Sequence, residues 1–240
     1  MKERVFDLRA DVCAYGSVVG SKEHQGPLGN LFDMHDEDDK FGQKTWEQAE
    51  SEMQRRALGV ALKKWGHDAG ALGALLAGDL LNQCIGSAYG LIDYHVPYFG
   101  LYGACSTAAL GMMLGAVLVS AGHVRHAAAV TSSHNTAAER QYRTPVEYGA
   151  QRTPTAQWTV TGASAFILGK CDHTEPSHAC VVQAMPGIPI EMGIRDDVAI
   201  MIGGAPVTQS FCDSIGADFY TPDAATCAEV ALDVINKKQA

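Results

Sequence analysis

Apolar and polar positions recur along the chain with two different periods, and each period predicts one type of secondary structure. Residues 11–20 alternate, are rich in β-branched side chains and end at a glycine, which is typical of a strand. Residues 45–65 instead carry apolar side chains at helical spacing: Met53, Leu58, Ala61, Leu62 and Trp65. Because Thr45 and Gln48 match a capping box, this segment is predicted to be the first long helix.

Further along the chain, three short apolar runs have the length of buried strands, at residues 71–77, 96–102 and 126–131. Residues 106–121 are helical in composition and are followed by Gly122, a typical helix end. Residues 157–168 alternate like a strand at a sheet edge or with one solvated face. Strands separated by helices over this length predict a layered α/β domain with a largely parallel central sheet.

The pattern changes after residue 170. Residues 171–178 are polar and contain a proline, which is typical of a linker or turn. A shorter rhythm of strand, helix, strand and helix follows at residues 198–202, 207–215, 218–220 and 223–236. The sequence therefore predicts a main domain over residues 1–170, a linker over 171–192 and a β-α-β-α tail over 193–240.

Composition and charge exclude several classes of protein. The 240 residues are 47% hydrophobic and 19% charged, which is enough to fill a sizeable core and argues against a disordered chain. The formal net charge of −9 has the wrong sign for a non-specific nucleic-acid binder. Glycine, cysteine, serine and threonine interrupt the longest apolar stretch, residues 101–119, so we interpret it as a buried helix and not a membrane span.

The seven cysteines are scattered, with no CxxC pair and no Cys/His pair at zinc spacing. An odd, scattered set in a sequence without a signal peptide predicts free thiols in a reducing compartment. His173 and His178 flank a proline-containing turn and form only a weak pattern for metal binding. The sequence therefore predicts no metal site.

Polar or reactive side chains follow three of the predicted strands. Asp79, Cys105 and His134 each come shortly after a strand end, and Asn82 lies close to Asp79 in sequence. The carboxyl ends of parallel strands share one edge of a sheet, where ligand sites gather. We therefore take these four residues as the candidate ligand-binding site.

The role of Cys105 has more than one interpretation. It opens the predicted helix at residues 106–121, where amide N–H groups and the helix dipole stabilise a thiolate or a bound anion. The residue could thus be a nucleophile or an anion-binding position, or a small inert residue where a strand and a helix pack closely. Asp79 has an alternative role as the N-cap of a helix.

Residues 139–153 concentrate three arginines in an acidic chain. Each arginine alone fits a solvated, salt-bridged loop. Together they fit a lid in which Arg140 or Arg143 meets an anionic ligand. No GxGxxG, GxxxxGK[ST] or GxSxG motif occurs, so nucleotide binding by those loops and a serine nucleophile elbow have no support.

Several longer motifs in residues 11–170 resemble the stage V sporulation protein AD family. They are GPLGNLFD (26–33), QKTWEQAE (43–50), LAGDLLNQ (76–83), GACSTA (103–108), TSSHNTAAERQYRTPVEYG (131–149) and TVTGASA (159–165). The resemblance implies a thiolase-like α/β/α domain, of which the chain holds the first half. It also implies that Cys105 stands where thiolases and ketoacyl synthases have their nucleophile.

The same resemblance implies a function in sporulation. Members of the family bind dipicolinic acid, which is usually carried with calcium, and act without catalysis in the spore uptake system. They associate peripherally with the forespore inner membrane, on its cytoplasmic side, together with other proteins of that system. Thiolase-fold proteins usually dimerise, so a homo-oligomer is also implied.

Two other functions remain open from the sequence. An acyl transferase would use Cys105, although the catalytic residues of the second thiolase half are missing. Residues 193–236 resemble the C-terminal part of a corrinoid-binding methyltransferase domain, including the GGAPVT turn. The DxHxxG motif, whose histidine binds cobalt, is absent, and this argues against cobalamin as a cofactor.

Overall fold

The computed structural model describes residues 10–81, 84–142, 159–170, 199–203, 207–222 and 224–239. The chain divides into two compact units, Phe6–Val182 and a smaller unit that combines Met1–Val5 with Gln183–Ala240. The linker predicted over residues 171–192 lies outside the described residues.

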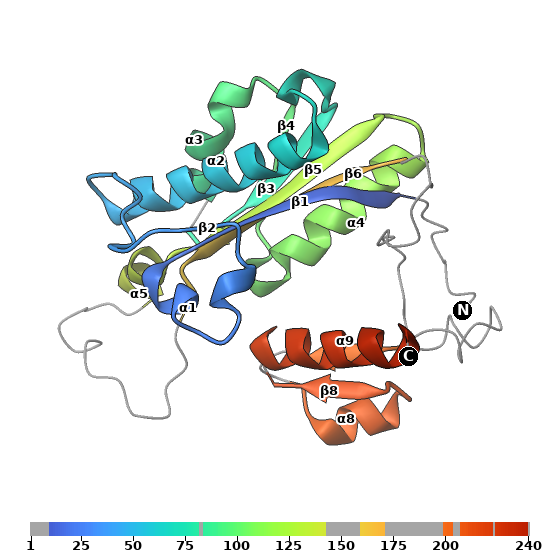
Figure 1. Ribbon diagram of the computed structural model, residues 1–240. Helices are drawn as coiled ribbons and strands as arrows, with labels where there is room; N and C mark the ends of the chain where they lie inside the picture. Colours follow the sequence, from blue (N-terminus) through green and yellow to red (C-terminus); the bar gives the residue numbers. More distant parts are fainter. Residues whose placement is uncertain are drawn as a thin grey trace. The chain divides into compact units, whose positions relative to one another are not determined.

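The larger unit is built on a six-stranded sheet with the order β2-β1-β6-β5-β3-β4 (Figure 1). The strands are β1 (Asp11–Val19), β2 (Met34–His35), β3 (Ala74–Gly78), β4 (Tyr98–Gly100), β5 (His126–Ser133) and β6 (Gly162–Gly169). β1 pairs in parallel with β2, and β3 pairs in parallel with both β4 and β5. β6 is antiparallel to both of its neighbours, β1 and β5.

β6 departs from what its sequence pattern predicts. Its alternation suggested an edge strand or one solvated face, but the strand lies in the centre of the sheet, where Ile167 and Leu168 are fully buried. Ser133 at the end of β5 pairs with Gly162 at the start of β6, so the chain leaves and re-enters the sheet at the same edge. A connection of this kind gives an antiparallel pair, whereas a parallel pair needs a crossover.

Helices cover both faces of this sheet (Figure 1). α2 (Trp46–Trp65) and α3 (Ile85–Leu91) lie on one face, and α4 (Thr107–Ser120) lies on the other. The Thr45 hydroxyl accepts a hydrogen bond from the Gln48 amide at 3.2 Å, which confirms the predicted cap of α2. The helix ends at Gly66, whose φ of +78° is the left-handed conformation that glycine adopts without strain.

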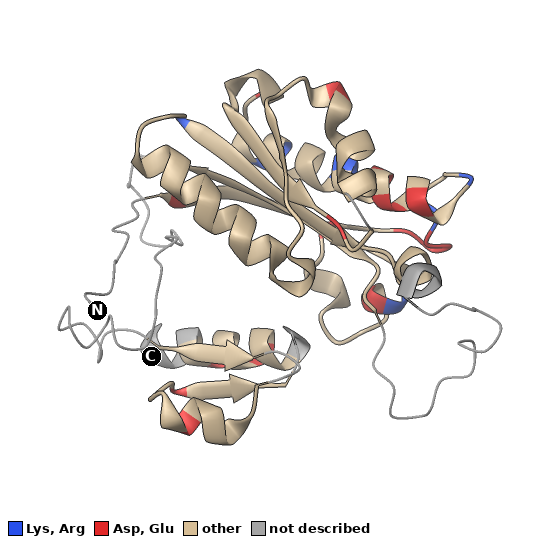
Figure 2. Cartoon of the chain, turned by 180° about the vertical axis from the view of Figure 1, so that it is seen from behind, with Lys and Arg blue, Asp and Glu red and all other residues tan. Residues whose placement is uncertain are grey.

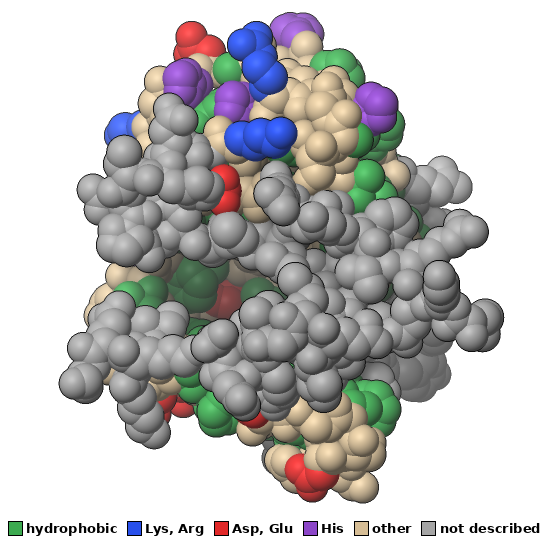
Figure 3. All heavy atoms as spheres, turned by 90° about the vertical axis from the view of Figure 1, so that its right-hand side faces the viewer, with side chains coloured by type: hydrophobic (Ala, Val, Ile, Leu, Met, Phe, Trp, Pro, Cys, Tyr) green, Lys and Arg blue, Asp and Glu red, His purple; other side chains and the backbone are tan. Residues whose placement is uncertain are grey.

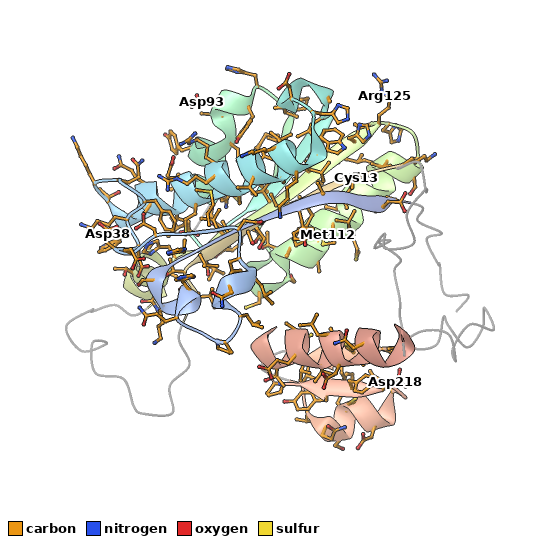
Figure 4. All side chains as sticks on the ribbon, viewed as in Figure 1. Cys13, Asp38, Asp93, Met112, Arg125 and Asp218 are labelled. Carbon is orange, nitrogen blue, oxygen red and sulfur yellow. The ribbon has the colours of Figure 1, made fainter. Side chains whose placement is uncertain are left out.

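α4 packs against the sheet through small residues and carries no Lys, Arg, Asp or Glu (Figure 2). A Cβ at Gly115 would lie 2.7 Å from Leu168 Cδ1, so a larger residue there would have to displace the Leu168 side chain. Met112, labelled in Figure 4, belongs to the same helix. Within the described part of the chain, no helix combines the length and the apolar character needed to cross a membrane.

Several short elements complete the larger unit. Residues 21–43 contain α1 (Ser21–His24), the 3-10 turn η1 (Gly29–Leu31) and β2. The other elements are η2 (Ala69–Ala71), η4 (Ile92–Tyr94), η5 (Ala104–Ser106) and α5 (Asn135–Tyr142).

The smaller unit has the predicted β-α-β-α order. A parallel pair, β7 (Met201–Gly203) and β8 (Phe219–Thr221), is accompanied by α8 (Gln209–Ser214) and α9 (Ala224–Gln239). Asp218, labelled in Figure 4, precedes β8 and accepts a hydrogen bond from the Ile200 amide at 2.8 Å. The carboxylate therefore fastens the start of β8 to the start of β7.

The cysteines agree only in part with the prediction of free thiols. Cys84, Cys105, Cys212 and Cys227 are free. Cys13 on β1, labelled in Figure 4, is disulfide-bonded, and its partner lies outside the described residues. The prediction is therefore wrong for Cys13, because scattered spacing in sequence does not show which cysteines meet in the fold.

Candidate functional site

The carboxyl ends of β3, β4 and β5 meet at one edge of the sheet, because these three neighbouring strands are parallel. Asp79 directly follows β3, and His134 directly follows β5. Cys105 lies in η5, a few residues beyond the end of β4. The structure thus places the three described candidates just beyond adjacent strand ends.

Cys105 is the exposed member of this set, and its thiol is free. It lies in η5, which leads into α4, and the amides of Ser106 and Thr107 donate to the backbone oxygens of Gly103 and Ala104. Ser106, the N-cap residue of α4, makes no side-chain capping hydrogen bond. The preceding residue, Ala104, has a φ of +47°, which is unusual for a residue with a side chain. The sharp turn at Ala104 therefore places the exposed thiol of Cys105 next to a helix start that has no side-chain cap.

Asp79 is buried and has a structural partner. Its Oδ2 accepts hydrogen bonds from the amide and the hydroxyl of Ser87, at 2.6 and 2.8 Å. Ser87 is in the first turn of α3, and Cys84 at the N-cap of that helix offers no capping side chain. Asp79 therefore caps α3 from a distance. Burial raises the pKa of this carboxyl, and the bonds from Ser87 partly oppose the shift.

His134 is completely buried, and both of its ring nitrogens are used within the protein. Nε2 lies 2.8 Å from the backbone oxygen of Asp39, and Nδ1 accepts a hydrogen bond from the Thr136 amide at 3.2 Å. The first contact requires the proton to be on Nε2. Burial lowers the pKa of the ring, so His134 is neutral at pH 7. It connects the loop that contains Asp39 to the start of α5 and has no spare N–H for a ligand.

The remaining candidates fall outside the described part of the molecule. Asn82 and Arg143 are not among the described residues, nor is the side chain of Arg140. Where the structure is described, no group of three or more His, Cys, Asp and Glu side chains could hold a metal ion.

The most extensive polar network near this edge was not predicted from the sequence. Glu50 and Gln54 of α2 are fully buried and connect through Ser132 of β5. A signal for them exists, because they continue the helical stripe of Met53, Ala57 and Leu58 toward the core. Polar residues at core positions are uncommon and mark a site where hydrogen bonding matters.

A surface hollow of about 560 Å³ lies at the opposite end of the larger unit, where α2 ends. It is lined by Gly59, Leu62, Lys63, Gly66, His67, Asp68, Ala69 and Tyr94. Figure 3 shows His, Lys and Arg side chains gathered toward the top of the molecule. Burial lowers the pKa of His126 near this end, and its neighbours His67 and Arg125 add to the shift. None of the candidate site residues lines this hollow.

The fold defines the class of protein. The 3-oxoacyl-(acyl carrier protein) synthase III, FabH, of Xanthomonas oryzae pv. oryzae is 15% identical, with a TM-score of 0.52 over 91% of this chain and 85% of that chain. The priming β-ketosynthase from the R1128 polyketide biosynthetic pathway is 14% identical, with a TM-score of 0.51 over 92% and 84%. Likeness at this identity shows the fold alone, and the fold is thiolase-like.

Sequence comparison identifies one family within this class. The sequence model of stage V sporulation protein AD (SpoVAD) matches residues 2–227. The stage V sporulation protein AD of Bacillus subtilis (strain 168) is 36% identical over 215 residues, which are 90% of this chain and 62% of that protein. The chain belongs to the SpoVAD family of sporulation proteins and spans less than two thirds of this relative. The family model matches as far as residue 227, whereas the individual motifs that resemble the family all lie before residue 170.

A second similarity is short. Trimethylamine corrinoid protein 1 of Methanosarcina acetivorans is 52% identical over 50 residues, 21% of this chain and 20% of that protein. Dimethylamine corrinoid protein 1 of the same organism is 44% identical over 91 residues, 38% of this chain and 39% of that protein. Such partial matches agree with the resemblance predicted for the tail and show no second family for the whole chain.

Proposed function

We propose that this chain binds dipicolinic acid, pyridine-2,6-dicarboxylate, as a non-catalytic component of the dipicolinate uptake system in sporulation. Membership of the SpoVAD family supports a role in sporulation. The observation that carries the ligand is the start of α4, where exposed Cys105 precedes a helix without a side-chain cap. The helix dipole favours negative charge at this end, where the Ser106 and Thr107 amides already donate to the Gly103 and Ala104 backbone oxygens.

The described residues have different parts in this proposal. Asp79 and His134 are buried, so we assign them to holding the edge in place while the amides at α4 meet one carboxylate. Arg140 and Arg143 remain proposed partners of the second carboxylate. Calcium enters the proposal only as an ion carried with dipicolinate.

Calorimetric titration with dipicolinate tests this account through two substitutions at one position. Cys105→Ala is expected to weaken binding by about threefold or less, because the amides of α4 remain. Cys105→Asp is expected to weaken it by about tenfold or more, because a carboxylate there occupies those amides and repels the dianion. Higher salt should weaken binding further, since the ligand is charged.

Two controls make the result specific to this edge. Cys227→Asp adds the same charge on α9 in the smaller unit and should leave the affinity unchanged. Pyridine-2-carboxylate, which has only one carboxylate, should bind more weakly than dipicolinate. Loss of all binding in Cys105→Ala would show that the thiol itself is required and would reject recognition by amides.

Acyl transfer by Cys105 is the second candidate, because the thiol is exposed and follows the strained Ala104. Such strain clusters at functional sites. Incubation with an acyl-CoA would then increase the protein mass by one acyl group, and Cys105→Ala would not gain it. An unchanged mass in a protein that binds dipicolinate would exclude this function.

The proposed role also implies a place in the cell. We assign the chain to the cytoplasmic side of the forespore inner membrane, together with other proteins of the uptake system. Fractionation of sporulating cells should then recover the protein with that membrane and release it at high salt. Recovery in the soluble fraction at low salt would contradict this location.

We also propose that the larger unit self-associates through an apolar patch on α3 and the edge strand β4. The patch consists of the exposed side chains of Ile85, Tyr89, Ile92, Tyr98, Phe99 and Tyr102. Among the described strands, β4 is at the end of the sheet and pairs only with β3, so its outer edge is a candidate for pairing with another strand. Exposed apolar surface of this kind marks an interface.

Sedimentation velocity over a range of concentrations tests the patch. The double variant Tyr89→Glu/Phe99→Glu is expected to shift the protein to monomer, because two charges would be buried without partners. Leu31→Glu, at an apolar side chain exposed to 65% outside the patch, serves as the control and should sediment like the wild type. A wild-type protein that stays monomeric at high concentration would contradict the proposal.

A further inference from the structure

A hydrogen-bond network of Gln54, Ser132 and Glu50 connects α2 to the ends of β3 and β5. Gln54 Nε2 donates to the backbone oxygen of Gly78 at 3.1 Å and to Ser132 Oγ at 2.7 Å. Ser132 Oγ in turn donates to Glu50 Oε1 at 2.8 Å. Both N–H groups of Gln54 and the single O–H of Ser132 are thereby used. The side chains of Gln54 and Ser132 therefore have no donor left for any other acceptor.

Asp79 lies next to this hydrogen-bond network. A Cβ at Gly86 would lie 3.2 Å from Asp79 Oδ2 and 3.5 Å from Glu50 Cγ, so both acidic side chains reach the same glycine. Ser87 holds Asp79 Oδ2, whereas Oδ1 accepts no hydrogen bond. Two carboxyl groups are thus buried near one another between α2, α3 and the end of β3.

Three buried acceptors in this region lack a donor: Glu50 Oε2, Gln54 Oε1 and Asp79 Oδ1. Among the described residues only one other buried side-chain atom, Glu23 Oε2, is in the same situation. Each buried acceptor without a donor destabilises a protein by about 1–3 kcal/mol. A proton on one of the two carboxyl groups would turn one of these acceptors into a donor for one of the other two and would remove a buried charge.

No cation in the described part of the chain supplies that donor. The charged neighbours that act on Glu50 are Asp79 and, on its own helix, Glu47, and both are acidic. Near Asp79, Cys84 and Tyr98 also titrate, but burial raises the pKa of each, so both remain neutral around pH 7. Ser87 from α3 and Ser132 from β5 carry no charge. A proton on one of the two carboxyl groups is therefore the simplest way to complete the cluster.

We infer that Glu50 carries a proton in the folded protein at neutral pH and acts as a positioning residue, whose O–H completes the cluster that holds Asp79 at the edge of the candidate site. Burial raises the pKa of Glu50 to about 8, with Asp79 and Glu47 adding to the shift. The hydrogen bond from the Ser132 hydroxyl and, to a smaller extent, the backbone amide of Leu80 oppose the shift only in part. Glu50 thus combines the geometry and the protonation state that the cluster needs.

This inference rests on the proposed function where it predicts how the ligand behaves. When Glu50 loses its proton above about pH 8, a second negative charge appears beside Asp79, just beyond β3. That charge repels a dianion and loosens the cluster behind the site. Because both carboxyl groups of dipicolinate are ionised throughout pH 6–9, a change in affinity over this range comes from the protein.

The first experiment needs no ligand. The side-chain carboxyl carbons are followed by carbon-13 NMR from pH 4 to 9 in the wild type and in Glu50→Gln. We expect one glutamate resonance to titrate near pH 8 and to vanish in the variant. A Glu50 resonance that titrates near pH 4.5 would overturn the inference, whatever the ligand does.

The second experiment titrates dipicolinate at pH 6, 7, 8 and 9. The wild-type affinity is expected to fall about tenfold between pH 7 and 9. Glu50→Gln, which keeps the size and a hydrogen-bond donor without titrating, should hold its pH 7 affinity at pH 9. Glu229→Gln makes the same replacement at an exposed side chain of α9 and should follow the wild type.

The outcomes separate the inference from the proposed function. Failure of the wild type to bind dipicolinate at any pH rejects the proposed function, while the NMR titration still decides the protonation of Glu50. Binding that is equally tight at pH 7 and 9, with Glu50 titrating near pH 8, overturns the positioning role.

Discussion

The wild-type protein is expected to lose much of its stability between about pH 5 and pH 8, and the substitution Glu50→Gln is expected to prevent this loss. The folded-state pKa of Glu50 is raised to about 8 from an ordinary value of 4.5, so folded Glu50 keeps its proton in this window while the unfolded chain releases it. By linkage, the free energy of unfolding falls by about 1.4 kcal/mol per pH unit while this difference lasts. The stabilisation is complete below pH 4.5 and is lost as the pH rises to about 8. The total is on the order of 5 kcal/mol.

Urea unfolding at half-unit steps of pH measures this effect. The difference between Glu50→Gln and wild type isolates Glu50, because every other titrating group is shared by the two proteins. The free energy of unfolding of the variant, minus that of the wild type, should rise steadily from pH 5 to 8 and then stay constant. With Glu229→Gln, at an exposed side chain of α9, as the variant, the same difference in the free energy of unfolding should stay flat. A flat difference for Glu50→Gln would show that the carboxyl titrates normally.

Gly78→Ala is expected to lower the free energy of unfolding by about 3 kcal/mol. Gly78 is the last residue of β3, and a Cβ there would lie 2.1 Å from the Leu101 backbone oxygen and 2.7 Å from Thr107 Cγ2. The backbone of Leu101 cannot yield freely, because its amide donates to the oxygen of Ala77 at 2.7 Å. The methyl group would therefore separate β3 from the start of α4.

The matched control is Gly70→Ala, where a Cβ would have no atom within 4 Å. Its free energy of unfolding should stay within about 0.5 kcal/mol of the wild type. Thermal or urea unfolding of both variants at pH 7 gives the comparison. Equal stability of Gly78→Ala and Gly70→Ala would mean that the end of β3 can shift without cost to the fold.

Much of the fold is readable from the sequence because local signals and burial agree. α2 begins at a capping threonine, ends at a left-handed glycine and has one apolar stripe, so its bounds follow from the chain itself. The apolar runs of β3 and β5 carry no charged residue and are too short for a typical helix, which favours buried strands. Because a largely parallel sheet was expected, the sequence pattern also predicts that Asp79 and His134 lie at a shared edge, where both are found.

Other features depend on contacts that the local sequence does not show. α3 is short, contains two glycines and is capped by Asp79 from outside the helix, so no local signal marks its start. The burial of His134 depends on the Asp39 backbone oxygen, which comes from a distant part of the chain. Glu50 is an ordinary helix-forming residue by composition, and only the packing of α2 against β5 makes its carboxyl exceptional.

The central position of β6 has a consequence for the order in which the protein can fold during synthesis. β6 is the last of the described strands of the larger unit along the chain, yet β1 and β5 both pair with it. Until it emerges from the ribosome, β1 with β2 and β5 with β3 and β4 can form only two separate fragments, each with an open edge. Joining them requires contacts between the two ends of the unit, which form slowly. During translation the nascent chain therefore exposes aggregation-prone strand edges for longer than a sheet assembled in sequence order, and it is there that chaperones would act.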